Sequence, residues 1–290
     1  MSNTLKPTSI ANKINLGRKY ILPYFGQKSI NKITPADIRI WHGDLITKHG
    51  LSTGSIKTIH AQASSIFNYA VKFYNLAKNP CQIAGNVGKS NRSLKFWTAS
   101  QFRIFVFCFL ENCRDTPMRK FLYLTLFYTL FYTGIRLGEL LALTPKDFDY
   151  ANKILNINKN RNILNIVTTP KTPGSIRTIL LPEALTIMIN EWIEKAMIDK
   201  NDFIFGAIAG RTTIKFWLDR YTAMAKLPAI RIHDFRHSHA ALLIELNVPP
   251  MVIAERLGHE SVNTTLSVYA HLYPNKQQVA VQALNTISGF

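Results

Sequence analysis

The chain has 290 residues, of which 47% are hydrophobic and 18% charged, and this balance excludes an intrinsically disordered protein. The length allows two domains of ordinary size and at least one large core. The net charge of +18 is uneven: residues 1–96 carry 14 Lys and Arg but only two acids, whereas residues 97–290 carry 21 basic and 15 acidic residues. So basic a first segment indicates nucleic acid as partner, the alternative being a basic surface kept for solubility.

The cysteines and the longest apolar run indicate a cytoplasmic protein with no membrane partner. Cys81, Cys108 and Cys113 are odd in number and form no CxxC pair, so we interpret them as buried thiols in a reducing compartment. No apolar signal-peptide region is present at the N-terminus. The longest apolar run, residues 121–133, is shorter than the roughly 20 residues of a membrane span and therefore predicts a buried helix.

Residues 1–85 are predicted to form an N-terminal helical bundle. Thr34, Pro35 and Asp37 have the spacing that starts a helix, with a capping hydroxyl, a proline in the first turn and an acid at the third position. A second helix is indicated from Ser55 by six apolar residues at helical spacing; these are Ile56, Ile59, Ala63, Ile66, Phe67 and Ala70. The stretch from Gly85 to Lys95 is glycine-rich, basic and nearly free of large apolar groups, which favours a linker at residues 86–96 that is able to lie along DNA.

Residues 97–276 predict a second domain that is mainly α with a small antiparallel β-sheet, an α+β arrangement. A capping box at Thr98 and Gln101 opens a helical region that continues to about residue 143. Strands are predicted at 154–157, 163–169 and 177–181, with Lys171 in the turn between the last two. Helices resume near 182 and 212 and run from 233 almost to the end, followed by a tail at 277–290.

Arg136 directly follows the apolar run, and Glu139 lies three residues further on, within reach across one helix face. A charged residue at the edge of a buried helix needs either a partner or a functional role. A structural ion pair between the two is one interpretation, and a site for an anion is the other.

The segment HDFRHSH presents His233, Arg236 and His237 at i, i+3 and i+4. Two histidines four residues apart resemble part of a zinc site, but the glutamate of an HExxH motif is missing and Arg236 would repel a cation. A phosphate site fits better, with Arg236 binding anionic oxygens and His233 exchanging a proton. We interpret His237 and His239 as structural.

Tyr269 and Lys171 are candidate catalytic residues because the chain also contains this Arg- and His-rich segment. A tyrosine phenol can attack a phosphodiester, and its adduct with phosphate stores the energy of the broken bond. Guanidiniums supply positive charge where the pentacoordinate phosphorus gathers negative charge. A lysine on a turn can reach a DNA groove or protonate a leaving oxygen.

Together these segments resemble the tyrosine recombinase family, also called phage integrases, and most closely the integrases of Gram-positive phages and conjugative transposons. The resemblance is carried by TGIRLGEL, TPKTPGSIRTILLP, HDFRHSHAALL and ERLGHESVNTTLSVYAHL, and it covers about the last 190 residues. Residues 1–85 resemble the family's core-type DNA-binding helical domain through weaker motifs. The matching catalytic positions are Arg136, Lys171, His233, Arg236, His259 and Tyr269, with Glu139 in support.

The resemblance implies a role for each of these positions. Tyr269 would attack DNA to form a 3′-phosphotyrosine, and Lys171 would protonate the leaving 5′-oxygen. The scissile phosphate would be bound by Arg136 and Arg236. His259 would donate a hydrogen bond to it, and His233 would transfer a proton. No metal, ATP or other cofactor is implied.

The implied partners are double-stranded DNA carrying recombination sites, further copies of the chain in a tetramer on that DNA, and an accessory DNA-bending or excision factor. The setting would be the nucleoid of a bacterium or a phage-infected cell. Residues 1–12 are too few for the arm-binding domain of many such integrases, so we expect a truncated or naturally short form. The tail at 277–290 carries Val279, Val281, Leu284, Ile287 and Phe290, and it is expected to dock on a neighbouring subunit.

Four alternatives remain beside integration and excision of a mobile element. A recombinase that resolves chromosome dimers or a type IB topoisomerase would use the same chemistry. An inactive relative would keep the fold, although all six catalytic positions are filled. A non-catalytic helix-turn-helix protein is suggested by the glycine turn at 254–258 before residues 262–269, but it leaves Arg136, Lys171, His233 and Arg236 without a role.

Overall fold

A computed structural model describes residues 7–88, 94–162, 165–169, 173–208, 210–273, 281 and 284–286. Lys171 and most of the tail at 277–290 lie outside these residues. The chain divides into two compact units, residues 1–93 and 94–290. Among the described residues, no helix combines the length and apolar character needed to cross a bilayer.

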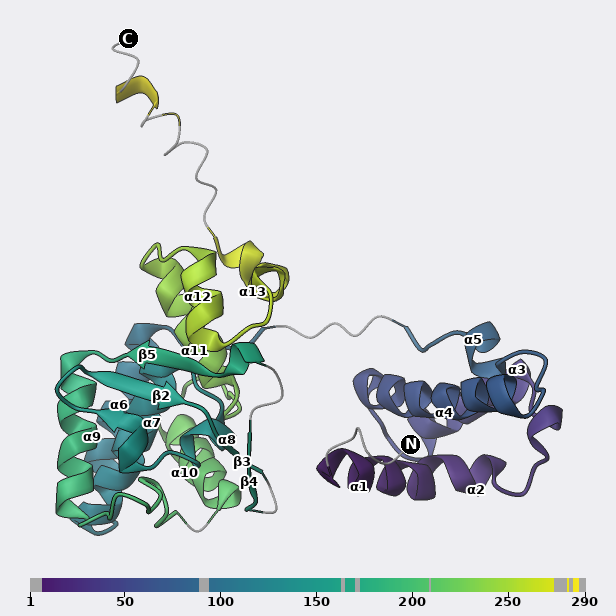
Figure 1. Cartoon of the computed structure of the whole chain (residues 1–290), viewed down its shortest axis with the longest axis horizontal. Helices are drawn as coiled ribbons and strands as arrows, with labels where there is room; N and C mark the ends of the chain where they lie inside the picture. The colour runs from purple at the N-terminus through teal and green to yellow at the C-terminus, as the bar shows by residue number, and fades with distance from the viewer. Residues whose placement is uncertain are drawn as a thin grey trace. The chain divides into compact units, whose positions relative to one another are not determined.

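The first unit is helical (Figure 1). Its elements are α1 (Pro7–Leu16), a π-helical turn (Gly17–Ile21), α2 (Leu22–Phe25), a 3₁₀ turn (Ile30–Lys32), α3 (Pro35–Thr47), α4 (Thr53–Phe73) and α5 (Pro80–Ala84). The predicted capping box is present, since Thr34 accepts from the backbone of Asp37 and the Asp37 carboxylate accepts from the backbone of Thr34. The side chain of Asn79 likewise caps α5.

The core of the first unit forms around Trp41, which is fully buried and donates from its indole to the carbonyl of Tyr20 at 2.8 Å. Five of the six apolar residues predicted for the inner face of α4 are buried, whereas Ile66 is 45% exposed. A pair of buried histidines joins α3 to α4, with 2.9 Å between His42 Nε2 and His60 Nδ1.

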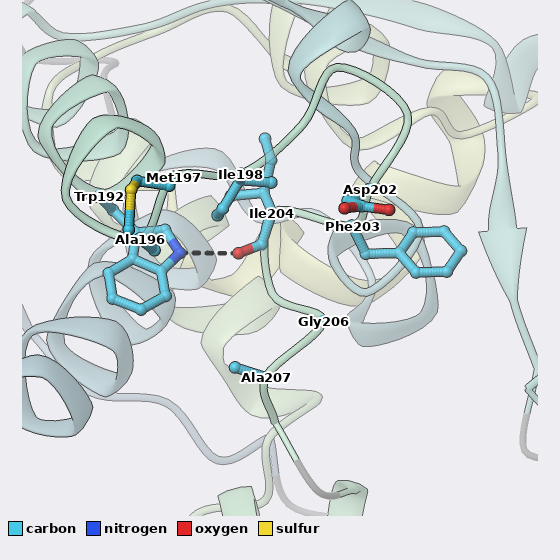
Figure 2. Close-up of a pocket in the computed structure, with 9 residues that line it drawn as sticks. All are labelled: Trp192, Ala196, Met197, Ile198, Asp202, Phe203, Ile204, Gly206 and Ala207. Atoms are coloured by element: carbon cyan, nitrogen blue, oxygen red, sulfur yellow. Dashed lines mark hydrogen bonds between the residues drawn. The ribbon is translucent and has the colours of Figure 1, made fainter.

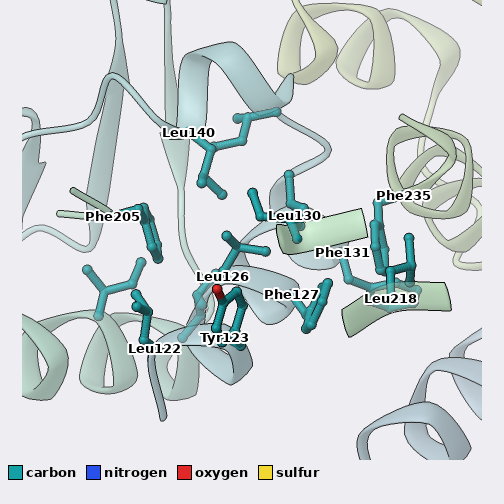
Figure 3. Close-up of a cluster of buried hydrophobic side chains, with 14 of the residues drawn as sticks. Leu122, Tyr123, Leu126, Phe127, Leu130, Phe131, Leu140, Phe205, Leu218 and Phe235 are labelled. Carbon is teal, nitrogen blue, oxygen red and sulfur yellow. The ribbon is translucent and has the colours of Figure 1, made fainter. Parts of the chain in front are cut away.

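The second unit is built around α7 (Pro117–Thr133), which is buried on most sides (Figure 3). The remaining α-helices are α6 (Ala99–Asn112), α8 (Leu137–Leu140), α9 (Glu183–Lys195), α10 (Arg211–Met224), α11 (Asp234–Glu245), α12 (Pro250–Leu257) and α13 (Val262–Tyr269). The side chains of Thr125, Thr129 and Thr133 donate to carbonyls one turn earlier, so these hydroxyls are satisfied inside α7 itself. This allows the helix to be enclosed by apolar side chains.

The described residues of the second unit also form two small antiparallel sheets. Strands β1 (Phe148–Asp149), β2 (Ile154–Ile157) and β5 (Arg177–Leu180) form one in the order β1-β2-β5, with Leu155 opposite Ile179. Strands β3 (Asn160–Arg161) and β4 (Val167–Thr168) form the other. The predicted strand at 163–169 is therefore only partly right, because its described part pairs in a separate ladder with residues that the sequence pattern did not indicate. The expectation of a mainly α fold with a small antiparallel sheet is confirmed.

Candidate active site

The turn after α7 brings the first predicted site residue into place. Gly134 adopts a left-handed conformation with φ of +63°, and a Cβ atom here would lie 2.8 Å from side-chain atoms of both His239 and Leu257. Only glycine satisfies both conditions without strain. The turn ends α7 and places Arg136 at the start of α8, outside the helix face that the sequence pattern had suggested.

Glu139 joins two arginines. Arg136 donates to it from both its backbone and its guanidinium, and the latter contact is 2.8 Å. The second partner is Arg177 on β5, which donates at 2.9 Å, and the side chains of Arg177 and Glu139 are 4% and 3% exposed. Burial alone would raise the pKa of Glu139, but the hydrogen bond and charge of Arg177, together with Arg136, bring that pKa below its ordinary value. The carboxylate is therefore ionised at neutral pH and orients Arg136.

Arg236 is held rigidly inside the protein. It is 4% exposed, and its Nη1 and Nη2 donate to the carbonyls of Gly134 and Leu257 at 3.1 and 2.5 Å. Burial, followed by the charges of Arg136 and Arg177, lowers the pKa of Arg236 to about 9. Three guanidiniums thus repel one another around a single carboxylate, and an anion such as phosphate would relieve that repulsion.

His259 lies beside this cluster, just after the left-handed Gly258 that ends α12. Its Nδ1 is 2.8 Å from the Thr265 hydroxyl, which leaves Nε2 as the ring nitrogen for a ligand. Burial, Arg236 and Arg136 lower the pKa of His259 to about 4. The ring is therefore neutral at pH 7, and when Thr265 donates to Nδ1, Nε2 carries the proton and can donate a hydrogen bond.

His233 stands at the N-cap position of α11 with an exposed face. Partial burial of the ring, and then the charges of His237 and Arg236, lower the pKa of His233. Its ring lies edge-on to that of His237, with 5.6 Å between the centroids.

Tyr269 is the last residue of α13 and is 1% exposed. Its ring belongs to an apolar cluster with Ala240, Ile244 and Ile253, and burial raises the pKa of its phenol to about 12. The hydroxyl is 2.8 Å from His237 Nδ1. The charge of Arg236 opposes this rise in pKa, and the hydrogen-bond partner of the phenol, His237, directly follows Arg236 in α11.

Sequence reasoning missed Arg177 and the contact of His237 with Tyr269. The inward position of Arg177 follows from the alternation of β5, where residues 177 and 179 are buried and 178 and 180 exposed, so period-two alternation was the available signal. The interpretation of His237 as structural does not include this contact, whose partner lies 32 residues further along the chain. Behind His237 lies Asp234, which is fully buried and paired with Arg231 at 2.7 Å.

Lys171 lies outside the described residues, but the chain that follows it is anchored at the site. A Cβ added to Gly258 would lie 3.1 Å from the carbonyl oxygen of Gly174, and one added to Gly174 would lie 3.8 Å from that of His259. Gly174, three residues after Lys171 in the sequence, therefore lies against the turn that carries His259.

Two hollows differ in chemistry. One of about 720 Å³ lies beside Arg136 and His233, and Arg211, Lys215 and Arg231 also line it. The other, of about 360 Å³, is mainly apolar and surrounds the tip of α9, where the indole of Trp192 donates to a backbone carbonyl (Figure 2). Among the described residues, no group of three or more His, Cys, Asp or Glu side chains could hold a metal ion.

Comparisons with known proteins define the class. Residues 108–276 match the Phage integrase family, and residues 1–46 match the Phage integrase N-terminal SAM-like domain. The chain therefore belongs to the phage integrase, or tyrosine recombinase, family.

Individual relatives point the same way. The chain is 33% identical over 302 residues to the ICEBs1 integrase of Bacillus subtilis (strain 168), covering 97% of this chain and 78% of that protein. It is 29% identical to a XerC-like tyrosine recombinase of Caldanaerobacter subterraneus, with the same coverage of both chains. The Tn1549 transposon integrase, solved in complex with circular intermediate DNA, has a similar fold with a TM-score of 0.81 and 20% identity, over 98% of this chain and 96% of that chain.

Proposed function

We propose that the chain is the integrase of a mobile element, which cuts and rejoins DNA at specific sites through a 3′-phosphotyrosine intermediate. The observation that carries this proposal is the set of hydrogen bonds that brings the site residues together. Arg236 donates to the carbonyls of Gly134 and Leu257, two residues before Arg136 and His259, and the Tyr269 phenol bonds to His237, the neighbour of Arg236. A phosphodiester has the charge and the oxygen acceptors that such a cluster binds.

The proposed chemistry exchanges one phosphoester for another. Tyr269 Oη forms a bond to the scissile phosphorus, and the bond from phosphorus to the 5′-oxygen breaks. Arg136 and Arg236 bind the non-bridging oxygens, to which His259 also donates. Lys171 gives a proton to the leaving 5′-oxygen. When the 5′-hydroxyl of another strand attacks the phosphotyrosine, these steps run in reverse.

His233 and Glu139 complete the proposed site. The pKa of His233 is lowered, so its exposed ring is predominantly neutral at pH 7 and can exchange a proton near the phosphate. Glu139 does not meet the phosphate in this scheme; it orients Arg136 through the hydrogen bonds already described.

Duplex DNA is the proposed substrate of both units. The first unit combines its high positive charge with a match to the integrase SAM-like domain. In the second unit, Arg211, Lys215 and Arg231 line the hollow beside Arg136 and offer cations to a phosphate, although Lys215 is paired with Asp219 and Arg231 with Asp234. Phosphate contacts of this kind make binding strongly dependent on salt concentration.

Four copies on two duplexes are proposed for strand exchange, with the tail at 277–290 docking on a neighbouring subunit. Deleting residues 277–290 should preserve cleavage of a single site but impair the synaptic complex seen on native gels. Normal synaptic complexes from the deleted chain would contradict this role. An accessory DNA-bending or excision factor is proposed to set direction, and its addition should shift the ratio of integration to excision.

Covalent trapping tests the proposed function. The chain is incubated in EDTA with nicked duplexes that contain the ends of its candidate element, and adducts that survive denaturation are counted. Wild type should give an adduct, Tyr269→Phe should give none, and Tyr273→Phe is the matched control because that phenol lies nearby in the sequence without a proposed role. Tight DNA binding without an adduct would instead indicate a DNA-binding protein without this chemistry.

A further inference from the structure

The nucleophile itself has a hydrogen-bond partner that the proposed scheme does not use. His237 Nδ1 is 2.8 Å from Tyr269 Oη, and the two rings meet at 61° with 5.7 Å between their centroids. His237 lies one turn into α11 and Tyr269 ends α13, so this contact ties the nucleophile to the helix that carries Arg236.

The far side of the imidazole faces a carboxylate. His237 Nε2 is 4.0 Å from Oδ1 of Asp234, which is fully buried, and Arg231 binds that carboxylate through Nε and Nη2 at 2.7 to 3.2 Å. A carboxylate on the Nε2 side favours the tautomer in which Nε2 carries the proton and Nδ1 is the acceptor. Nδ1 is then oriented to receive a hydrogen bond from the phenol.

The protonation states suit a proton acceptor. Burial lowers the pKa of His237, while Asp234 opposes this effect, so the imidazole is predominantly neutral at pH 7. The phenol has its pKa raised to about 12 and therefore keeps its proton until attack. Within the part of the chain that the structure describes, the charged and titratable groups that act on His237 are Asp234, Arg231, Arg236, His233 and His259.

We infer that His237 is a further catalytic residue, which takes the proton from Tyr269 Oη as that oxygen attacks the phosphorus. This inference rests on the proposed function. The proton moves from Oη to Nδ1, the bond from Oη to phosphorus forms, and the bond to the 5′-oxygen breaks. The imidazolium so formed faces Asp234 through Nε2, which stabilises its charge. In the rejoining step His237 returns the proton to Tyr269 as the phosphotyrosine bond breaks.

The alternative role is a latch, in which the same hydrogen bond retains a buried phenol in a resting position. The two roles predict opposite results. Removing a base slows cleavage on the order of 10²–10⁴-fold, whereas removing a latch accelerates it. The Asn side chain can place its amide oxygen near the position of Nδ1, so His237→Asn keeps a hydrogen-bond acceptor for Tyr269 but cannot take a proton.

The experiment measures the rate of adduct formation on the nicked duplex by wild type and His237→Asn over a range of pH, with DNA affinity measured in parallel. We expect the variant to bind DNA normally, to cleave about 10²-fold more slowly or worse, and to lose the rise in rate through the histidine pKa. A fluorinated tyrosine at position 269, whose phenol ionises near neutral pH, should restore much of the variant's rate. A variant that cleaves as fast as wild type, or faster, overturns the inference.

A substrate with sulfur in place of the bridging 5′-oxygen separates His237 from Lys171. A thiolate leaves without a proton, so this substrate should rescue a Lys171→Ala chain but leave His237→Asn slow. Rescue of both variants would contradict the assignment of His237 to the nucleophile. The fluorinated tyrosine in an otherwise unchanged chain adds a test that leaves position 237 intact: it should flatten the pH dependence, and an unaltered profile would contradict the inference. If wild type forms no adduct at all, the proposed function fails, and the inference with it.

Discussion

Replacing Glu139 by glutamine tests whether the buried ion pair with Arg177 organises the site. Arg177 cannot turn to solvent when its partner loses charge, because it also donates from Nε to the carbonyl of Arg256 at 2.7 Å and from Nη1 to that of Ser175 at 3.1 Å. Breaking one side of a buried pair costs about 3–5 kcal/mol. Glutamine keeps the shape and one acceptor, so we expect the lower end, about 3 kcal/mol; the half-exposed Arg136 adds less than about 1 kcal/mol.

The assay unfolds the full chain in urea and monitors the unfolding by pulsed hydrogen exchange and mass spectrometry. Peptides from α7 report the second unit separately from those of α4 in the first. Glu191→Gln is the matched control, because the Glu191–Lys195 pair is exposed and its loss should cost less than about 1 kcal/mol. The double variant Glu139→Gln/Arg177→Met removes both charges and should recover part of the lost stability.

The pH dependence has a definite sign. The pKa of Glu139 is lower in the folded chain than in the unfolded one, so its contribution is present above the unfolded value and is lost as pH falls through the folded value. The difference between wild type and Glu139→Gln should therefore shrink in acid. A difference below about 1 kcal/mol at pH 7, or one that persists undiminished in acid, would refute the reasoning.

Three further outcomes are expected. The pKa of His42 is lowered to about 4 and that of its buried partner His60 is also lowered, so the first unit should lose stability as pH falls from about 6.5 towards 4. The loss should reach up to about 3 kcal/mol for His42, and acid unfolding of His42→Phe should lack that component. Gly134→Ala should destabilise the second unit by at least about 1–2 kcal/mol from its left-handed backbone alone, measured by urea unfolding against Gly43→Ala, whose Cβ meets no atom within 4 Å. Arg236→Lys should reduce the rate of adduct formation on the order of 10²–10³-fold with little change in DNA affinity, and a loss of affinity without a loss of rate would contradict its role.

Much of the fold and part of the candidate site could be predicted from the sequence, because these features depend on residues that are close together in the chain. Helix starts at Thr34 and Thr98 depend on residues three positions apart, and both capping boxes are present. Arg136 and Glu139 were close enough in sequence to be paired, and the structure confirms their contact. The position of Arg136 differs from the expectation only because Gly134 ends α7 and a separate helix, α8, begins after the turn.

The remainder depended on partners that are distant in sequence. Arg177 reaches Glu139 across 38 residues, and His237 reaches Tyr269 across 32. Alternation in β5 indicates that Arg177 points inward, but it does not identify Glu139 as the partner. Both partners are set by how β5 and α13 pack around other elements. The ladder of β3 and β4 was missed for a related reason: two-residue strands are too short to show alternation.

The rigidity of Arg236 suggests how such a protein could bind DNA outside its target site without cleaving it. A flexible lysine follows any phosphate along a duplex and attracts all of them alike. A guanidinium whose Nη1 and Nη2 are already bound to backbone carbonyls cannot follow. Under the proposed function, it interacts strongly only with a phosphate that is brought to one position, as negative charge develops on the phosphoryl group. The same molecule can therefore bind DNA of any sequence weakly without cutting it, because flexible lysines would provide the weak binding and the fixed Arg236 would act only at a correctly placed phosphate.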